Sequence, residues 1–311
     1  MLSLLSNIDV SDWPFAIGSF IGLRTLYLRL CSIILTTRVV RNWYELLELK
    51  LGLKKSISVL FSTGQVLEIT RGFDWHKWNM ARRAASKNKK IRFLKRDWVS
   101  FDFIGRRILF LGDNIEQFFD EDYSFLDCKG RTVVDIGAND GDTAIYFWAK
   151  GAAKVIAFEP YPNLCRRARK NFKANGTRNV DIVNAGLAEK GGEITISENF
   201  QADASQSLTI YGKGKKVKIL ALSQVVGKYS LKGAVLKSDC ECYEYGILLK
   251  SSDQTLAAFD QVILEYHSGY RDLRQRLTAA GFSVAKIGRP FYSYYKPDAR
   301  HMMLGLLYAK R

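Results

Sequence analysis

The sequence predicts an α/β protein, with a doubly wound and mostly parallel sheet in its C-terminal part and an α+β extension before it. Short apolar runs alternate with helix-like segments from residue 130 onward. The links between these segments are short, and the apolar run 133–137 ends in glycine, as a buried parallel strand commonly does. Alternation of this kind is typical of strand–helix–strand units joined by right-handed crossovers.

The N-terminal part, residues 1–125, is expected to contain its own mixture of helices and strands. Residues 57–69 indicate two short strands around a Thr-Gly turn, and residues 98–112 repeat the pattern around a glycine. The stretch 75–90 has a helix-like composition, and 113–124 is a polar and aromatic connector. We therefore assign this part as a separate extension.

The main domain is expected to cover residues 126–311. Strands are expected at 133–137, 154–158, 180–184, 234–239, 261–266, 282–288 and 302–309. Helices are expected at 143–150, 163–174, around 243–251 and at 271–280. A β-rich insert, 193–222, is expected to add three short strands at 193–197, 207–211 and 216–220.

Composition places the chain among ordinary globular proteins. It has 311 residues, of which 47% are hydrophobic and 25% charged, so bulk disorder and fibrous repeats are excluded. Its five cysteines are too few and too scattered for a disulfide framework in a chain of this length. We therefore expect a cytoplasmic protein in a reducing compartment.

The N-terminal residues show no pattern of a signal peptide. The apolar stretch 14–37 is interrupted by Arg24 and Arg29. Neither uncharged piece approaches the roughly 20 residues that a spanning helix needs. We expect no transmembrane helix; a core helix is favoured, and a peripheral helix at the membrane surface stays open.

A strongly basic segment spans residues 77–107. It carries eleven lysines and arginines against two aspartates, in a chain whose net charge is +16. Such a segment attracts polyanions, so RNA or an anionic membrane surface is a candidate partner, as is a phosphorylated or sulfated substrate. A solvated face that only adds solubility is an equally good explanation.

Two acids mark the ends of the first two strands expected in the main domain. Asp135 comes just before the glycine-rich bend 137–141, and Glu159 lies 24 residues later, at the end of the next strand. In open α/β sheets, ligands bind beyond the carboxyl ends of strands. The bend is not the dinucleotide fingerprint, because Asn139 takes the place of its second glycine and a carboxylate would repel a pyrophosphate.

The same two acids suggest which ligand binds there. Asp135 would favour a ligand that presents positive charge, such as an ammonium or a sulfonium. A carboxylate at the position of Glu159 can accept hydrogen bonds from both hydroxyls of a ribose. A nucleoside with a cationic amino-acid tail meets both demands, so we expect S-adenosyl-L-methionine as the cofactor.

Four stretches carry recognisable motifs. They are V-V-D-I-G-A-N-D-G-D-T (133–143), V-I-A-F-E-P (155–160), L-K-S-D-C-E-C-Y-E-Y (236–245) and L-E-Y-H (264–267). Together they resemble the FkbM-type family of class I S-adenosylmethionine-dependent methyltransferases, over about half of the chain. The resemblance implies a seven-stranded, Rossmann-like sheet with six parallel strands and the last inserted antiparallel, and usually O-methylation of sugars or natural products.

The resemblance also implies roles for single residues. The residues expected at the cofactor are Asp135, Gly137, Ala138, Asn139, Gly141, Asp142, Thr143, Glu159, Pro160, Asn184 and Ala185. Among them, Asp135 and the bend would hold the methionine end and Glu159 the ribose, while Asn184 and Ala185 would flank the adenine. The family usually has glycine after its fourth-strand D-x-E, where this chain has Cys242.

Methyl transfer to a hydroxyl also needs a positioned acceptor and a base for its proton. The candidate catalytic residues at this sheet edge are Asp239, Glu241 and His267, and the resemblance implies that Asp239 faces the methyl group. Lys237 shares a strand face with Asp239. As a buried lysine it is expected to pair with Asp239 or Glu265.

We expect no metal in the site. Asp239 and Glu241 could hold a divalent ion that orients a diol, but two acids are too few ligands. The Cys-x-Cys pair formed by Cys240 and Cys242 has no second Cys or His pair nearby, so it is a weak metal signal.

The acceptor is expected to be a hydroxyl of a sugar, a glycan or a related small molecule. The chain has Ser-Asp-Cys-Glu at 238–241 instead of the Asn/Asp-Pro-Pro-aromatic tetrad usual for base amines, and it contains no Pro-Cys dipeptide for cytosine methylation. An RNA methyltransferase that uses 77–107 as a clamp is one alternative. A non-catalytic nucleoside-binding or membrane-surface protein is another.

Overall fold

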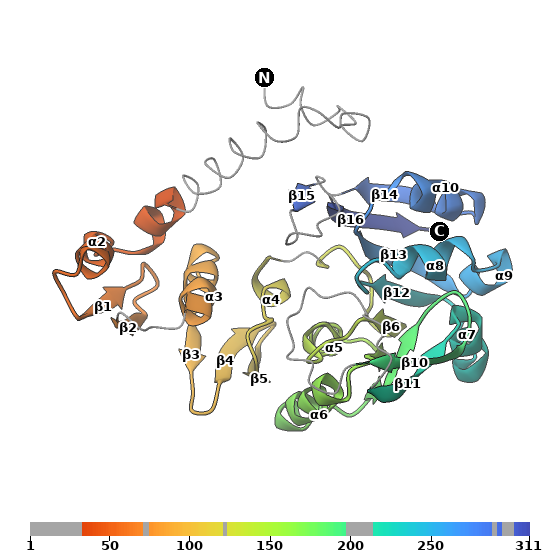
Figure 1. Cartoon of the computed structure of the whole chain (residues 1–311), viewed down its shortest axis with the longest axis horizontal. Helices are drawn as coiled ribbons and strands as arrows, with labels where there is room; N and C mark the ends of the chain where they lie inside the picture. The colour runs from red at the N-terminus through yellow and green to blue at the C-terminus, as the bar shows by residue number, and fades with distance from the viewer. Residues whose placement is uncertain (1–32, 71–74, 121–122, 197–213, 288–290, 294–301) are drawn as a thin grey trace, which may run out of the picture. The chain divides into compact units, whose positions relative to one another are not determined.

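The computed structural model describes residues 33–70, 75–120, 123–196, 214–287, 291–293 and 302–311. The chain divides into two compact units, Met1–Asp122 and Tyr123–Arg311 (Figure 1). None of the helices in the described residues combines the length and the apolarity that crossing a bilayer requires. The domain boundary after residue 125 stays a prediction from the sequence.

A β-hairpin between two helices lies in the described part of the N-terminal unit. β1 (Ser56–Leu60) and β2 (Val66–Thr70) pair antiparallel, which confirms the two strands expected around the turn at Gly64. α2 (Tyr44–Leu51) precedes this hairpin and α3 (Trp75–Ser86) follows it. The basic stretch therefore starts as a helix, as its composition suggested.

A second hairpin completes the N-terminal unit. β4 (Trp98–Phe103) and β5 (Arg106–Leu111) form the expected pair, and β3 (Ile91–Phe93) extends it to three strands. The sequence does not predict β3, because three residues with a central arginine show no clear alternation. The short helix α4 (Gln117–Asp120) places two phenylalanine rings against Phe101, with ring centroids 4.9 and 5.2 Å apart.

The C-terminal unit is built on a seven-stranded sheet in the order β14-β16-β13-β12-β6-β7-β8, and a short eighth strand, β15 (Phe291–Ser293), pairs with β16. The seven strands are β6 (Thr132–Ile136), β7 (Lys154–Phe158), β8 (Val180–Val183), β12 (Ala234–Ser238), β13 (Phe259–Tyr266), β14 (Ser283–Ile287) and β16 (Met302–Lys310). Six are parallel, and β16 is inserted antiparallel between β13 and β14. This confirms the expected fold class.

The central strands are apolar because both of their faces are covered. β6, β7 and β12 are buried along nearly their whole length, as expected for parallel strands between two layers of helices. The register aligns Val134 with Ile156 on one side and with Leu236 on the other. These three side chains belong to one continuous core cluster.

Helices cover both faces of this sheet (Figure 1). They are α5 (Asp142–Ala149), α6 (Pro162–Asn175), α7 (Leu222–Tyr229), α8 (Glu244–Leu249), α9 (Asp253–Leu256) and α10 (Arg271–Ala279). Side chains of α7, α8, α9 and α10 join the core cluster that contains Val134 and Leu236. α5 covers the opposite face, where Thr143 contacts Asp135. The sheet is therefore doubly wound.

The expected insert forms a small separate sheet. β9 (Ala185–Leu187), β10 (Gly192–Ile196) and β11 (Lys215–Leu220) pair in the order β10-β11-β9. Two of the three strands expected in the insert are thus confirmed. The third, 207–211, lies outside the described residues.

The strand order reverses next to β6. The chain proceeds outward from β6 to β7 and β8, then returns to place β12 on the other side of β6. Ligands of open α/β sheets bind beyond the carboxyl ends of the strands at such a reversal. The loops that follow β6, β7, β12 and β13 therefore define the candidate site.

Candidate active site

The loop after β6 approaches the end of β12 so closely that only glycine fits at its start. Gly137 has φ +78°, and a Cβ atom there would lie 1.7 Å from the carbonyl oxygen of Asp239. The same loop continues through Asn139 and Gly141, which also have positive φ. Glycine adopts this left-handed region of φ freely and asparagine more readily than most residues, so the loop's own sequence favours its backbone conformation.

Asp135 lies beneath this loop and is fully buried. The Thr143 hydroxyl donates a 2.6 Å hydrogen bond to one carboxylate oxygen, and the Lys237 ammonium lies 3.1 Å from the other. Both oxygens are thus held by protein groups. These two contacts hold Asp135 beneath the loop, and its contact with a cationic ligand stays a prediction.

Lys237 pairs with Asp239, as expected, and more closely with Asp135, which was not expected. Its ammonium lies 3.1 Å from Asp135 and 4.0 Å from Asp239, and it donates to the carbonyl oxygens of Ile136 and Gly137 at 3.4 and 3.0 Å. The sequence-based prediction considered only the end of β12, where Asp239 lies, and β13, where Glu265 lies. The parallel register of β12 against β6 also aligns Lys237 with Asp135.

The charge balance keeps Lys237 protonated. Burial by itself lowers the pKa of a lysine, but the carboxylates of Asp135 and Asp239 more than compensate and raise the pKa of Lys237 above its usual value. A protonated lysine under the first loop links the ends of β6 and β12 through its charge and its hydrogen bonds.

Glu159, at the end of β7, faces the loop as a nearly buried carboxylate. One oxygen accepts a 3.0 Å hydrogen bond from the Asn139 amide and the other a 2.9 Å bond from the Tyr161 amide. Burial raises the pKa of Glu159 to about 7, although these two amides act in the opposite direction. Each carboxylate oxygen can accept a second hydrogen bond, so both remain able to receive a ribose hydroxyl.

The loop is braced from α6. Arg167 forms a 2.8 Å ion pair with the buried Asp140, and the Asn171 amide donates to the Asp140 carbonyl at 2.9 Å. Gly141 packs against Phe172, whose ring would lie 2.5 Å from a Cβ atom at that position. Asp142 begins α5 and is also buried, and burial raises the pKa of its carboxyl group well above the ordinary value.

The turn after β7 is held by Asn184, which follows β8. The Asn184 side-chain amide donates to the carbonyl oxygens of Glu159 and Pro160, at 3.0 and 2.8 Å. Ala185, the next residue, is buried. In the loop itself, Ala138 donates its amide to the Phe158 carbonyl at 3.0 Å. The predicted cofactor residues therefore come together at one edge of the sheet.

Two observations bear on whether these residues fit S-adenosylmethionine. Gly137 and Gly141 fix the shape of the loop at its two ends, because a Cβ atom would overlap the Asp239 carbonyl at the first and the Phe172 ring at the second. The side-chain oxygen of Asn139 is buried without a hydrogen-bond partner in the described part of the chain. A buried acceptor of this kind suits the ammonium group of an amino acid. The residues thus fit the cofactor.

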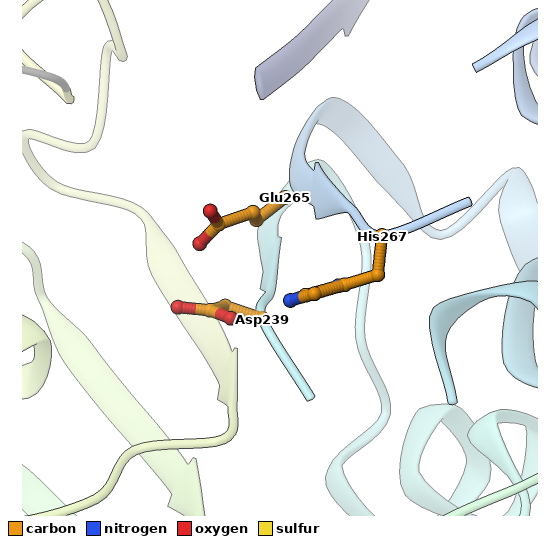
Figure 2. A group of neighbouring side chains, drawn as sticks. All are labelled: Asp239, Glu265 and His267. Carbon is orange, nitrogen blue, oxygen red and sulfur yellow. The ribbon is translucent and has the colours of Figure 1, made fainter. Parts of the chain in front are cut away.

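A second group of polar side chains gathers beyond β12 and β13, as Figure 2 shows. Asp239 follows β12, Glu265 lies near the end of β13, and His267 comes just after that strand. One potential ligand atom from each residue lies within 4.8 Å of the others. Asp239 and Glu265 are partly exposed, whereas His267 is buried.

Two further acids contact His267: Glu241 in the β12–α8 connection and Glu244, the first residue of α8. The imidazole Nδ1 atom lies 2.9 Å from Glu244, a fully buried carboxylate, and the Nε2 atom lies 3.4 Å from Glu241. Burial lowers the pKa of the imidazole, but the hydrogen bond and charge of Glu244, with Asp239 and Glu241, raise it to about 9. In the free protein His267 is therefore protonated at neutral pH, which disfavours its expected role as the base.

The sequence analysis missed two members of this group. Glu265 stands two residues before His267, and that spacing places both side chains on one side of an extended chain. This signal was available in the L-E-Y-H motif. Glu244 carried no such signal, because its contact with His267 spans 23 residues and depends on how α8 packs.

Cys242 occupies the position where the related family usually has glycine. Its φ is +79°, in the left-handed region, and its side chain is exposed. Glu241, directly before it, also has a positive φ of +53°. The turn therefore keeps a backbone that favours glycine even though this chain places cysteine there.

The fold and the site together define a class of protein. A seven-stranded sheet with its last strand inserted antiparallel, a glycine loop after β6 and an acid after β7 are those of a class I, S-adenosylmethionine-dependent methyltransferase. Residues 135–284 match the family model of the methyltransferase FkbM domain. The protein is accordingly a methyltransferase enzyme that uses S-adenosylmethionine, which favours catalysis over the non-catalytic alternative.

Several solved structures are similar to this chain at low identity. A ribosomal protein methylase from Lactobacillus delbrueckii subsp. bulgaricus is 16% identical, with 60% of this chain and 73% of that chain covered and a TM-score of 0.37. A precorrin-6y methyltransferase from Geobacter metallireducens is 13% identical, with 59% and 81% covered and a TM-score of 0.36. A structure described as a methyltransferase complexed with SAH is 8% identical, with 70% and 57% covered and a TM-score of 0.42. None of the curated proteins matches this chain.

Proposed function

We propose that this methyltransferase acts on a hydroxyl group of a sugar, a glycan or a related small molecule. The observation that carries the proposal is the group of carboxylates at the ends of β12 and β13, next to the loop that fits the cofactor. A hydroxyl must lose a proton when it is methylated, and carboxylates beside it can accept that proton or hold the hydroxyl in line.

The cofactor supplies a methyl group that is already activated on a sulfonium, so positioning accounts for much of the catalysis. Glu159 would orient the ribose, the bend 137–141 would hold the amino-acid end, and Asn184 would shape the adenine side. Asp135 and Lys237 support that bend from below.

Asp239 is the strongest candidate for contacting the acceptor hydroxyl. Its backbone amide donates to the Ile136 carbonyl at 3.0 Å, which places the residue beside the loop after β6. Its side chain keeps partial solvent access. Glu241 and His267 form the adjacent pair, and since His267 is protonated, this pair is better suited to orient an acceptor than to remove its proton.

Calorimetry on the full chain tests the cofactor site. Glu159→Gln should weaken S-adenosylmethionine binding by about tenfold or more, since a bidentate hydrogen-bonded carboxylate is lost. Glu189→Gln, which alters an exposed acid of the same unit, should leave the affinity unchanged. Undiminished binding by Glu159→Gln would overturn the assignment of this carboxylate to the ribose.

Transfer of a labelled methyl group tests the acceptor. Cell-extract glycans, small metabolites and RNA would be offered separately to the full chain. Label in the glycan or small-molecule fraction, lost in Asp239→Asn at unchanged cofactor affinity, supports the proposal. Label that enters only RNA or only protein would overturn it.

A second candidate function, methylation of RNA, is favoured by one observation in the N-terminal unit. Nine of the eleven basic residues of segment 77–107 are exposed. They are Arg83, Lys87, Lys89, Lys90, Arg92, Lys95, Arg96, Arg106 and Arg107. Of the two acids in the segment, Asp97 pairs with Lys77 at 3.6 Å and Asp102 with Arg107 at 3.5 Å. The remaining excess of positive charge suits a phosphate backbone.

Salt dependence tests this second candidate. RNA held by such a segment should be released steeply as salt rises, because bound counterions are exchanged for lysine and arginine. Replacing Lys87, Lys89 and Lys90 by glutamine should reduce RNA retention at low salt. No measurable retention of RNA at low salt would remove the RNA alternative.

A further inference from the structure

The end of β13 presents a carboxylate that the protein leaves without a partner. Within the described part of the chain, no hydrogen bond or ion pair engages the Glu265 side chain. Figure 2 shows this carboxylate beside that of Asp239, with the His267 ring reaching toward both from the other side. Three potential ligand atoms thus converge, all within 4.8 Å of one another.

The imidazole of His267 is oriented for ligation. Its Nδ1 atom is held at 2.9 Å by the fully buried Glu244, which also accepts hydrogen bonds from the backbone amide of His267 at 3.1 Å and from the Cys240 thiol at 3.8 Å. An imidazole that donates Nδ1–H to a carboxylate presents the lone pair of Nε2 when it is otherwise neutral. Metal-binding histidines in proteins are held by second-shell carboxylates in this way.

The group around His267 is rich in carboxylates. Four carboxylates, those of Asp239, Glu241, Glu244 and Glu265, surround one imidazole. Lys237 lies 4.0 Å from Asp239 but is 3.1 Å from Asp135, to which its charge is already committed.

We propose that Asp239, Glu265 and His267 bind a divalent metal ion at this edge of the sheet, with Glu244 as the positioning residue behind His267. Two carboxylate oxygens and one imidazole nitrogen suit a first-row ion such as Mn²⁺, which accepts both donor types. Binding replaces the proton on Nε2 of His267, so one proton is released for that ligand. The proposal changes the expectation of a metal-free site, which considered only Asp239 and Glu241.

Three protein ligands leave coordination positions open. If the proposed O-methylation is correct, on which this step rests, the open positions face the acceptor and favour substrates with two neighbouring oxygens, such as a vicinal diol. Such an ion would hold both oxygens and lower the pKa of the bound hydroxyl.

A manganese titration tests the site directly. The full chain, freed of metal with a chelator, is titrated with Mn²⁺ while the paramagnetic resonance signal of the free aqua ion is recorded. One tight site per chain is expected, and its affinity should fall at least tenfold in Asp239→Asn, Glu265→Gln and His267→Gln. The exposed-acid control Glu189→Gln should bind as the unaltered chain does. Thermal melting of each variant verifies that it is folded.

A second readout identifies the ligand atom and the role of Glu244. The chain has three histidines, so histidine-labelled protein gives a simple nuclear magnetic resonance spectrum in which the signal missing from His267→Gln is that of His267. Mn²⁺ should broaden this signal first. In Glu244→Gln the ion should bind more weakly, about tenfold, and with a changed dependence on pH, which a purely structural role would not produce.

The outcomes separate the metal site from the proposed function. Absence of a stoichiometric Mn²⁺ site, or a site indifferent to all three ligand substitutions, would overturn the metal proposal even if S-adenosylmethionine binding depends on Glu159. Conversely, a manganese site in a protein that methylates only RNA would leave this inference standing and overturn the proposed acceptor class.

Discussion

The two halves of the candidate site satisfy their charges in opposite ways. On the cofactor side, three buried acids have protein partners: Asp135 has Lys237, Asp140 has Arg167, and Glu159 has two backbone amides. On the acceptor side, at the ends of β12 and β13, several carboxylates face one imidazole, and Glu265 engages no partner among the described residues.

The cofactor side is therefore held in shape by the protein itself, whereas the acceptor side keeps a carboxylate that is available to a ligand. Buried charges that are already paired hold a loop in one shape, so they contribute to rigidity rather than to contact with a ligand. A carboxylate that lies among other carboxylates, as Glu265 does, raises the electrostatic energy of the site, which a bound cation or proton relieves. The cofactor half should therefore respond to substitutions mainly through stability and loop shape, and the acceptor half mainly through ligand binding.

The largest effect on stability is expected from substituting Gly137, because the loop of the cofactor side approaches Asp239 of the acceptor side there. Gly137→Ala would push a Cβ atom into the Asp239 carbonyl, 1.7 Å away, in a residue with φ +78°. We expect a loss of roughly 5 kcal/mol in the free energy of unfolding, with loss of cofactor binding. The matched control is Gly176→Ala, with φ +62° and no atom within 4 Å. It should cost only about 1 kcal/mol in denaturant unfolding, and equal losses would contradict the close approach.

The next largest effect on stability is expected from replacing Lys237, whose ammonium group pairs with Asp135 on the cofactor side. Lys237→Met leaves Asp135 buried without its ion-pair partner, which should lower the free energy of unfolding by about 3–4 kcal/mol. The double variant with Asp135→Asn should recover part of this loss. Lys232→Met, which alters an exposed lysine next to β12, should change stability by about 0.5 kcal/mol or less. A loss below about 1 kcal/mol in Lys237→Met would mean that the ion pair does not organise the loop.

The pH dependence of cofactor binding probes Glu159 alone. Its pKa in the free protein is raised to about 7, and ribose hydroxyls donate to the ionised form. Affinity should therefore fall as pH drops through 7, by up to about tenfold per pH unit, or ~1.4 kcal/mol. Glu159→Gln should remove this dependence, as measured by calorimetry between pH 5 and 8.

The same shift predicts the sign of a stability change in the free protein. Because burial raises the pKa of Glu159 in the folded state, the folded protein holds this proton more tightly than the unfolded chain. The free energy of unfolding should decrease as pH rises from about 4.5 to 7, and Glu159→Gln should flatten that interval. If the wild-type and Glu159→Gln profiles had the same slope across this interval, the raised pKa would be contradicted.

The smallest effect is expected at the turn of the acceptor half. Cys242→Gly relieves a left-handed backbone at φ +79°, so it should raise the free energy of unfolding by about 1 kcal/mol. Because the side chain is exposed, little packing is lost. Cys242→Ala is the control: it removes the thiol but keeps the Cβ atom, and it should leave the stability unchanged. A destabilised glycine variant would show that the cysteine side chain makes a contact that matters.

Much of the fold could be predicted because its signals are local. The apolar runs of β6, β7 and β12 and the glycines that follow them indicate buried parallel strands, and the acids at their ends locate the cofactor edge. The ion pair of Asp135 with Lys237 was not predicted, because strand neighbours follow from sheet order and not from position along the chain. β3 and α7 carried no pattern strong enough to predict.

By itself, the sequence determined which residues reach the carboxyl edge of the sheet, since hydrophobic period and glycine positions are properties of short segments. Only the tertiary structure decided which of them meet. The register of β12 against β6 brought Lys237 to Asp135, and the packing of α8 brought Glu244 to His267. Such pairings depend on distances across strands and helices that are far apart in the chain, and no local pattern of residues encodes them.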